Sequence, residues 1–185
     1  MQHTFKASWR DVFLASWLKY PSPMRPDIMS VDIIKKEFDP EKGTLKATRL
    51  IAIEGKIPSW MDLFIPRASV VYFLEESVMD IKNKTFVLTS QNITHTNILK
   101  TFETCRYTVD KLNPEWTRLE QTFQAGVTKF LFGVADKIEA FCIDMAKTQA
   151  QRGREVMDNA IKLVSETDFS NVLPSIPSLN ILAEL

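Results

Sequence analysis

Apolar residues near the amino end recur with the spacing of a helix. The aromatic positions of this segment are Trp9, Phe13, Trp17 and Tyr20. Ser8 followed by Asp11 resembles a capping box in which aspartate takes the place of glutamate. Pro21 then ends the element, because proline cannot continue a helix. The pattern predicts a short amphipathic helix over residues 9–19, preceded by a short strand at 3–7.

Further along, runs rich in β-branched and aromatic residues are separated by short polar turns, which is typical of strands in an antiparallel meander. The predicted strands cover residues 28–38, 44–53, 69–80, 85–95, 97–109 and 116–128. Alternation assigns one face of the second of these strands to Leu45, Ala47, Arg49, Ile51 and Ile53. One face of the last strand carries Leu119, Phe123, Ala125 and Val127.

The period changes to that of a helix from about residue 129 to 165. Its apolar stripe runs through Val134, Ile138, Phe141 or Cys142, Met145, Val156, Ala160 and Leu163. The fold class predicted is α+β: a curved antiparallel sheet of about seven strands gripping a long C-terminal helix. One domain is expected over residues 1–165. Residues 166–185 contain two prolines and no lasting period, so a flexible tail is expected there.

Composition and charge exclude several function classes. Of 185 residues, 45% are hydrophobic and 25% charged, and 23 basic residues balance 23 acidic ones. A net charge of zero gives no overall attraction to nucleic acid. The longest apolar runs are too short to span a bilayer, and "MQHTFKASWRDVF" lacks the features of a cleavable leader. Cys105 and Cys142 are expected to be buried thiols.

Residue patterns for catalysis or metal binding are missing from the sequence. His3 and His95 are the two histidines, and neither belongs to a metal-ligand pattern. Five glycines form no phosphate-binding loop. The polar stretch "SQNITHTN" fits a turn between strands. We therefore expect no catalytic residues, no metal and no cofactor.

The segment "EGKIPSWMDLFIPRAS" (54–69) places five large apolar residues between two prolines. Proline at both ends favours a loop or a single helical turn, and loops normally lie on the surface. Packing of this loop on its own core is one explanation. Another is that it covers an apolar cavity.

Two arginines on predicted inner faces leave two alternatives each. Met145, Gln149 and Arg152 continue the helix stripe. Arg152 is then either solvated where the helix emerges from the core, or a cation facing a cavity. Arg49 needs a partner if buried, which is either a glutamate on a neighbouring strand or a ligand.

Six segments together resemble the PRELI/MSF1 family over residues 2–165. They are "KYPSPMRPDIMSVDIIKKEFDP", "TRL", "GKIPSW", "VVYFLEESVMD", "NKTFVLTSQNITHTNILKTFET" and "RGREVMDNAIKL". Within the family, "NITHTNILKTFET" and "RGRE" are closer to the slowmo branch. The resemblance implies an internal lipid cavity and transfer of an anionic phospholipid between the mitochondrial outer and inner membranes. It also implies location in the intermembrane space, transient contact with membrane surfaces, and a heterodimer with a small, cysteine-paired helical-hairpin chaperone.

The resemblance also implies functional residues. Those expected at the lipid headgroup are Lys19, Arg49, Lys56, Gln149 and Arg152. Ile53 and Met145 stand where the phosphatidic-acid branch has lysines, so they are expected, with Phe141, to line the cavity. Loss of two cations weakens the case for phosphatidic acid. The slowmo branch is associated with phosphatidylserine, so the resemblance favours phosphatidylserine, with phosphatidic acid as the other candidate. The segment 57–66 corresponds to a lid, and its expected members are Ile57, Pro58, Trp60, Met61, Leu63, Phe64 and Ile65.

The function expected is transfer without covalent chemistry. Two other functions stay open. A lipid-binding sensor or scaffold of the same fold would bind lipid without exchanging it between vesicles. A hydrolase with a similar sheet and helix would need a catalytic acid or base inside the cavity, for which His95 is the residue to test.

Overall fold

The computed structural model describes residues 1–55, 59–61, 70–127 and 133–167 of the chain. Ten elements follow one another in this part: β1 (Gln2–Phe5), α1 (Trp9–Leu18), β2 (Ile28–Asp39), β3 (Thr44–Glu54), η1 (Ser59–Met61), β4 (Val70–Asp80), β5 (Thr85–Asn92), β6 (Leu99–Val109), β7 (Thr117–Val127) and α2 (Ala135–Glu166). The expected α+β class is confirmed. Residues 168–185, where the flexible tail was expected, lie outside the described residues.

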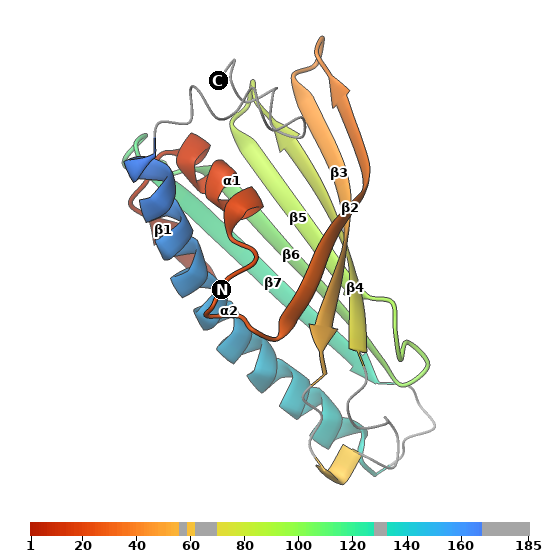
Figure 1. Ribbon diagram of the computed structural model, residues 1–185. Helices are drawn as coiled ribbons and strands as arrows, with labels where there is room; N and C mark the ends of the chain where they lie inside the picture. Colours follow the sequence, from red (N-terminus) through yellow and green to blue (C-terminus); the bar gives the residue numbers. More distant parts are fainter. Residues whose placement is uncertain (56–58, 62–69, 128–132, 168–185) are drawn as a thin grey trace.

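Seven antiparallel strands form one sheet in the order β1-β7-β6-β5-β4-β3-β2. All neighbours except β1 and β7 are consecutive in sequence, which is the meander expected from the short turns. Figure 1 shows this sheet curving, with α2 running along it and α1 lying beside the C-terminal part of α2. Breaks in the pairing register of β2 with β3, at Ile28/Ser30 and Ile33/Lys35, are bulges of the kind that bend a strand.

Helix α1 begins as the sequence predicts. The Ser8 side chain accepts a hydrogen bond from the Asp11 backbone N–H at 3.2 Å. In return its hydroxyl donates to the Asp11 carboxylate at 2.7 Å. This reciprocal cap satisfies a backbone donor that the first helical turn leaves free. Val12, Phe13 and Leu14 then enter the core.

The main core lies where α1 and the C-terminal part of α2 meet the sheet. Phe5, Phe13, Phe86, Tyr107 and Met157 belong to it. Phe13 meets Phe86 edge to face at a centroid distance of 4.9 Å, an arrangement that the ring quadrupoles favour. This core closes one end of the space between α2 and the sheet. A second, smaller cluster lies near the start of α2.

Three details of the predicted elements were wrong. Leu163 is 64% exposed and Val164 is buried in its place, so the buried stripe in this part of α2 runs through Met157, Ala160 and Val164. The strand predicted to reach residue 95 ends at Asn92, whose side chain bonds the backbone at Thr94, Leu99 and Thr101. His95 consequently lies in the following turn, with a φ of 56°.

Candidate functional site

A cavity of about 420 Å³ lies between the inner face of the sheet and α2. Residues from the connection between α1 and β2, from strands β1 to β7 and from α2 line it, among them Ile53, Phe73, Phe123, Phe141 and Met145. Its lining is neither uniformly apolar nor uniformly polar. Instead, side chains of similar character form layers that cross several strands.

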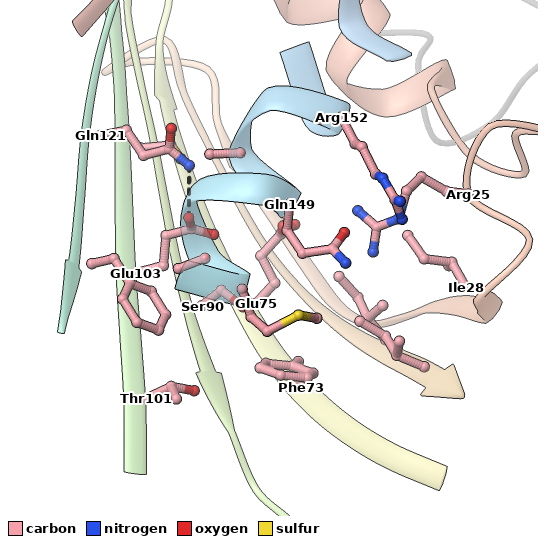
Figure 2. Close-up of a pocket in the computed structure, with 18 of the residues that line it drawn as sticks. Arg25, Ile28, Phe73, Glu75, Ser90, Thr101, Glu103, Gln121, Gln149 and Arg152 are labelled. Carbon is pink, nitrogen blue, oxygen red and sulfur yellow. Dashed lines mark hydrogen bonds between the residues drawn. The ribbon is translucent and has the colours of Figure 1, made fainter. Parts of the chain in front are cut away.

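The layers follow directly from strand register. Facing positions pair Arg49 with Glu75, Glu75 with Ser90, and Ser90 with Glu103. These four residues, which we call the polar row, cross strands β3, β4, β5 and β6 at one level. Successive residues on a strand face opposite sides, so members that pair in register face the same side of the sheet. Figure 2 shows three of them, Glu75, Ser90 and Glu103, on the sheet wall of the cavity.

Apolar layers lie on both sides of the polar row. Two residues further along the strands Ile51 pairs with Phe73, and four residues further Ile53 pairs with Val71. In the other direction, Leu45, Met79, Phe86, Tyr107 and Leu119 are in register within the main core. The polar row is therefore a continuous band of hydrogen-bonding groups at one level of the sheet wall.

Arg49 has the glutamate partner that was one of its two alternatives. Its Nε donates to Glu75 Oε1 at 2.7 Å, and Nη2 donates to the same oxygen. Arg49 is 4% exposed and Glu75 is 7% exposed, so the pair is buried. The guanidinium also lies 5.2 Å from the ring centre of Trp17. Glu75 is a cavity-lining residue, whereas Arg49 is not among the lining residues.

The carboxylate charge of Glu103 is less well compensated than that of Glu75. Gln121 Nε2 donates a hydrogen bond to Glu103 Oε1 at 2.7 Å, which Figure 2 shows as a dashed line. Burial raises the pKa of the Glu103 carboxyl, whereas the Gln121 bond and the charges of Lys19 and Arg25 lower it. Among the ion pairs of the described residues, none joins Glu103 to a cation within 4.0 Å.

Cations reach the cavity from the opposite wall. Lys19 lines it from the end of α1, with its ammonium 5.1 Å from the ring centre of Tyr20. Arg25 and Arg152 come from the segment before β2 and from α2, and Figure 2 shows them reaching toward the same part of the cavity. Arg25 also forms an ion pair with Asp27 at 2.8 Å. Arg152 is exposed and lines the cavity at once, which combines its two predicted environments.

Gln149 supplies an unsatisfied group to this site. Its Oε1 is buried without a hydrogen-bond partner, although the residue lines the cavity. Buried polar atoms normally have partners, so an orphaned acceptor beside a cavity is consistent with a ligand that donates to it. Figure 2 shows Gln149 between Arg152 and the sheet wall.

The segment between β3 and β4 is described only in part. Ser59–Met61 form one 3₁₀ turn, the single turn that the prolines favoured. Trp60 packs edge to face on Phe141 at 6.0 Å, and the Lys137 ammonium lies 4.5 Å from its ring centre. The other predicted lid residues lie outside the described residues or, for Met61, have an undescribed side chain: Ile57, Pro58, Met61, Leu63, Phe64 and Ile65. Lys56 also lies outside them.

The structure thus brings together Lys19, Gln149 and Arg152 of the predicted headgroup residues. Ile53, Phe141 and Met145 also line the cavity. Sequence reasoning missed Arg25, Ser90, Glu103 and Gln121 as lining residues. Strand alternation could have identified Glu103. It lies four residues before Tyr107 on β6 and therefore faces the same side of the sheet as that buried residue.

Other kinds of site find little support in the part of the chain that the structure describes. His95 is not among the cavity-lining residues. Within the described ranges, no three His, Cys, Asp or Glu side chains form a group that could hold a metal ion. Among the described helices, none combines the length and the apolar character needed to cross a bilayer.

Comparison with known proteins agrees with this geometry. The model of the PRELI-like family matches residues 10–167. The protein slowmo homolog of Dictyostelium discoideum is 44% identical over 171 residues, covering 92% of this chain and 74% of the relative. The PRELI domain-containing protein 1, mitochondrial, of Mus musculus is 31% identical over 153 residues, with 82% and 69% covered.

A solved structure supports the fold alone. The Zhui aromatase/cyclase from Streptomyces sp. R1128 aligns with a TM-score of 0.50 at 14% identity, covering 90% of this chain and 91% of that one. Identity this low carries no inference about activity. The family match covers most of the chain, and the slowmo homolog shares more than two fifths of its aligned residues. This chain therefore belongs to the PRELI-like family.

Proposed function

We propose that this chain is a mitochondrial phospholipid transfer protein that carries an anionic phospholipid, with phosphatidylserine favoured, between the outer and inner membranes. The observation that carries the proposal is a cavity, in a PRELI-like chain, whose lining combines apolar layers with one polar band and with basic side chains. A ligand with long apolar chains and a charged headgroup matches that division. Relatives named mitochondrial support the compartment, and the intermembrane space is the part of it that we propose.

The energetics of lipid transfer explain why an enclosed cavity is needed. Two chains of about sixteen carbons contain roughly 30 methylene groups, each of which costs about 0.8 kcal/mol to expose to water. The total is on the order of 20 kcal/mol, so an exposed lipid would not leave its membrane at a useful rate. Phe73, Phe123 and Phe141 offer the chains an apolar surface in its place.

Within this proposal the basic residues orient the headgroup. Lys19, Arg25 and Arg152 meet the phosphate, and Gln149 supplies an additional hydrogen bond. Arg49 acts through Glu75, since its guanidinium is already bonded there. Charge-assisted hydrogen bonds of this kind are the strong ones available to a phosphodiester. The segment 57–66 acts as the lid, and Trp60, seated on Phe141, is where that segment rests on α2.

The proposed partner is a small helical-hairpin chaperone, which would form a heterodimer with this chain. Transfer itself requires no bond to be made or broken, so we propose a carrier and not an enzyme. A sensor or scaffold would bind the same lipid without releasing it to a second membrane. Exchange between vesicles is therefore the property that separates the two functions.

The test is transfer between donor and acceptor liposomes by protein co-expressed with the chaperone. Labelled phosphatidylserine, phosphatidic acid and phosphatidylcholine would be compared for wild type, Arg152→Glu and Lys147→Glu. We expect selective transfer of an anionic lipid, reduced at least tenfold by Arg152→Glu, because a charge-assisted contact of about 1.5–3 kcal/mol becomes repulsive. Lys147 is exposed on the same helix and is not a cavity-lining residue, so its reversal should change transfer little.

Binding without exchange would contradict the carrier and leave a sensor. Equal losses in the two variants would contradict the role of Arg152, because they would reflect the overall charge of the helix surface. If the protein neither binds nor transfers any of the three lipids, that result would contradict the proposed function.

A further inference from the structure

The cavity contains as many acidic as basic groups, which is unusual for a site that holds only a phosphate. Among the described lining residues the basic ones are Lys19, Arg25, Arg152 and Arg154, and the acidic ones are Asp27, Glu54, Glu75 and Glu103. Asp27 is paired with Arg25, and Glu75 with Arg49. Within the described ranges, Glu103 is the acidic member of the polar row that forms no ion pair.

Acceptors converge beside Glu103. Arg49 donates to Oε1 of Glu75, and Gln121 donates to Oε1 of Glu103; among the bonds of the described residues, none engages Oε2 of either carboxylate. Ser90 lies between the two glutamates in register on β5. Neighbouring strands are about 4.8 Å apart, so the two glutamates flank Ser90 at roughly 10 Å from backbone to backbone. Side chains of this length can close on one small group placed over Ser90.

The unsatisfied carbonyl oxygen of Gln149 is the independent observation that points to a donating ligand. It approaches the cavity from α2, on the wall opposite the polar row, and is buried without a partner. A phosphate has only acceptor oxygens at neutral pH and cannot satisfy it. A primary ammonium has three N–H donors and no acceptor. It would therefore match two carboxylate oxygens and one amide oxygen.

We propose that Glu103, with Glu75 and Gln149, forms a subsite for the primary ammonium of an aminophospholipid headgroup. The inference rests on the proposed function and refines its substrate class. Lys19, Arg25 and Arg152 hold the phosphate, and the carboxylate of Glu103 selects headgroups that carry a positive charge beyond it. A headgroup of bare phosphate offers Glu103 no cationic group to contact directly, and only the more distant charges of Lys19 and Arg25 act on it. Glu103 is thus a specificity-determining residue, and the cavity distinguishes phosphatidylserine from phosphatidic acid by its acidic side chains.

Burial is consistent with this role. Removal from water raises the pKa of Glu103, and the nearby charge of Glu75 raises it further. An ammonium placed between the two would reverse both effects, because an opposite charge within about 4–6 Å favours the ionised carboxylate. The cavity therefore holds a carboxyl whose ionisation is costly, and an ammonium between Glu75 and Glu103 would lower that cost.

The test measures equilibrium binding of soluble dioctanoyl lipids to the full chain in complex with its chaperone, by calorimetry. The probes are dioctanoyl phosphatidylserine, its N-acetyl derivative and dioctanoyl phosphatidic acid. Wild type should bind phosphatidylserine at least tenfold more tightly than the N-acetyl derivative, which has no ammonium. Glu103→Gln keeps the side-chain shape and the acceptor for Gln121. It should weaken phosphatidylserine at least tenfold and leave phosphatidic acid within about twofold, since only the ammonium contact is charge-assisted.

Glu76→Gln is the matched control. Glu76 is exposed on β4, next in sequence to Glu75, and faces away from the cavity. It should bind all three probes as wild type does. Equal weakening of phosphatidylserine and phosphatidic acid by Glu103→Gln would overturn the subsite in favour of a purely structural role. No change, or equal wild-type affinity for phosphatidylserine and its N-acetyl derivative, would also overturn it.

Binding and transfer separate this inference from the proposed function. Selective binding without exchange between liposomes would contradict the carrier and support the subsite. Exchange of anionic lipids that Glu103→Gln does not alter would support the carrier and contradict the subsite.

Discussion

Single ionisable residues in this cavity differ in how well their charges are compensated. Glu103 is the clearest case, because a partly buried carboxyl without an ion-pair partner is unfavourable when ionised. Arg49 and Glu75 show the opposite arrangement, in which a buried cation and anion neutralise each other. The two situations lie two strands apart in the same polar row. They lead to different predictions for the free energy of unfolding.

Glu103→Gln should raise the stability of the lipid-free protein at neutral pH. Burial raises the pKa of Glu103 above its ordinary value of 4.5, so the folded state retains this proton to higher pH than the unfolded chain. The folded state then binds more protons in that window, and the free energy of unfolding falls as pH rises through it. Glutamine does not ionise and escapes this loss. Urea unfolding at neutral pH and below 4.5 would measure it, and a stability gain equal at both values would contradict the explanation.

Arg49→Met should destabilise the fold by about 3–5 kcal/mol, because it leaves the Glu75 carboxylate buried without its partner. The double variant Arg49→Met, Glu75→Leu should recover much of that loss, since it removes both charges from the interior. Urea denaturation of the two variants provides the comparison. Lys46→Met, on the exposed side of β3, is the control and should change stability by less than about 0.5 kcal/mol. A double variant as unstable as the single one would contradict this account.

At the scale of elements, helix α1 closes the end of the space between α2 and the sheet. Its residues Val12, Phe13 and Leu14 are almost fully buried, and Lys19 at its end lines the cavity. The helix is ten residues long. Isolated helices of that length are marginal in water, so tertiary packing and capping stabilise it. The cap at Ser8 should therefore have a measurable effect.

Ser8→Ala should lower the free energy of unfolding by about 1 kcal/mol, because the Asp11 backbone N–H loses its acceptor. For a domain of this size that corresponds to a melting temperature lower by about 2–4 °C. Differential scanning calorimetry would measure the change. Ser165→Ala, near the end of α2, removes an exposed hydroxyl that bonds Lys162 O and should have a smaller effect. Equal effects would indicate that the capping bond contributes nothing specific.

Periodicity predicted these elements well and the site only in part. Two-residue alternation placed Arg49 on the inner face correctly, because a strand interior tolerates no drift in parity. The helical period failed at Leu163, where Val164 is buried in its place. Arg25 belongs to a proline-flanked connection without any period, so no pattern could place it in the cavity. Strand alternation could have placed Glu103 on the inner face. Its position beside Ser90 and Glu75 depends on the register between strands, which one sequence does not contain.

At the scale of the whole molecule, the cavity determines how easily a reagent in solution reaches a buried thiol. Cys142 lines it and is 8% exposed. Burial raises the pKa of the Cys142 thiol to about 11. Only the thiolate reacts with alkylating reagents, so a buried thiol of this kind is a slow nucleophile. The rate at which Cys142 is alkylated should therefore depend on whether a ligand fills the cavity.

In the Cys105→Ala variant, iodoacetamide at pH 8 should modify Cys142 roughly 200-fold more slowly than a free thiol, because about 0.1% is thiolate against about a quarter. Loading with phosphatidylserine should slow it further by excluding reagent from the cavity. Mass spectrometry of timed samples would give both rates. Faster labelling of the loaded protein would contradict a lipid beside Cys142.

The polar row has a further consequence for how such proteins diverge. Its four members lie on four different strands, and none of them belongs to the neighbouring apolar layers. In the proposed carrier, a single point mutation in the row would therefore change the preferred headgroup without an insertion, a deletion or a loss of room for the acyl chains. Mutations in the layer of Ile51 and Phe73 can alter tolerance for chain length while the headgroup contacts persist. Cargo identity and carrying capacity are thus separable traits, and selection can act on one while the other is maintained.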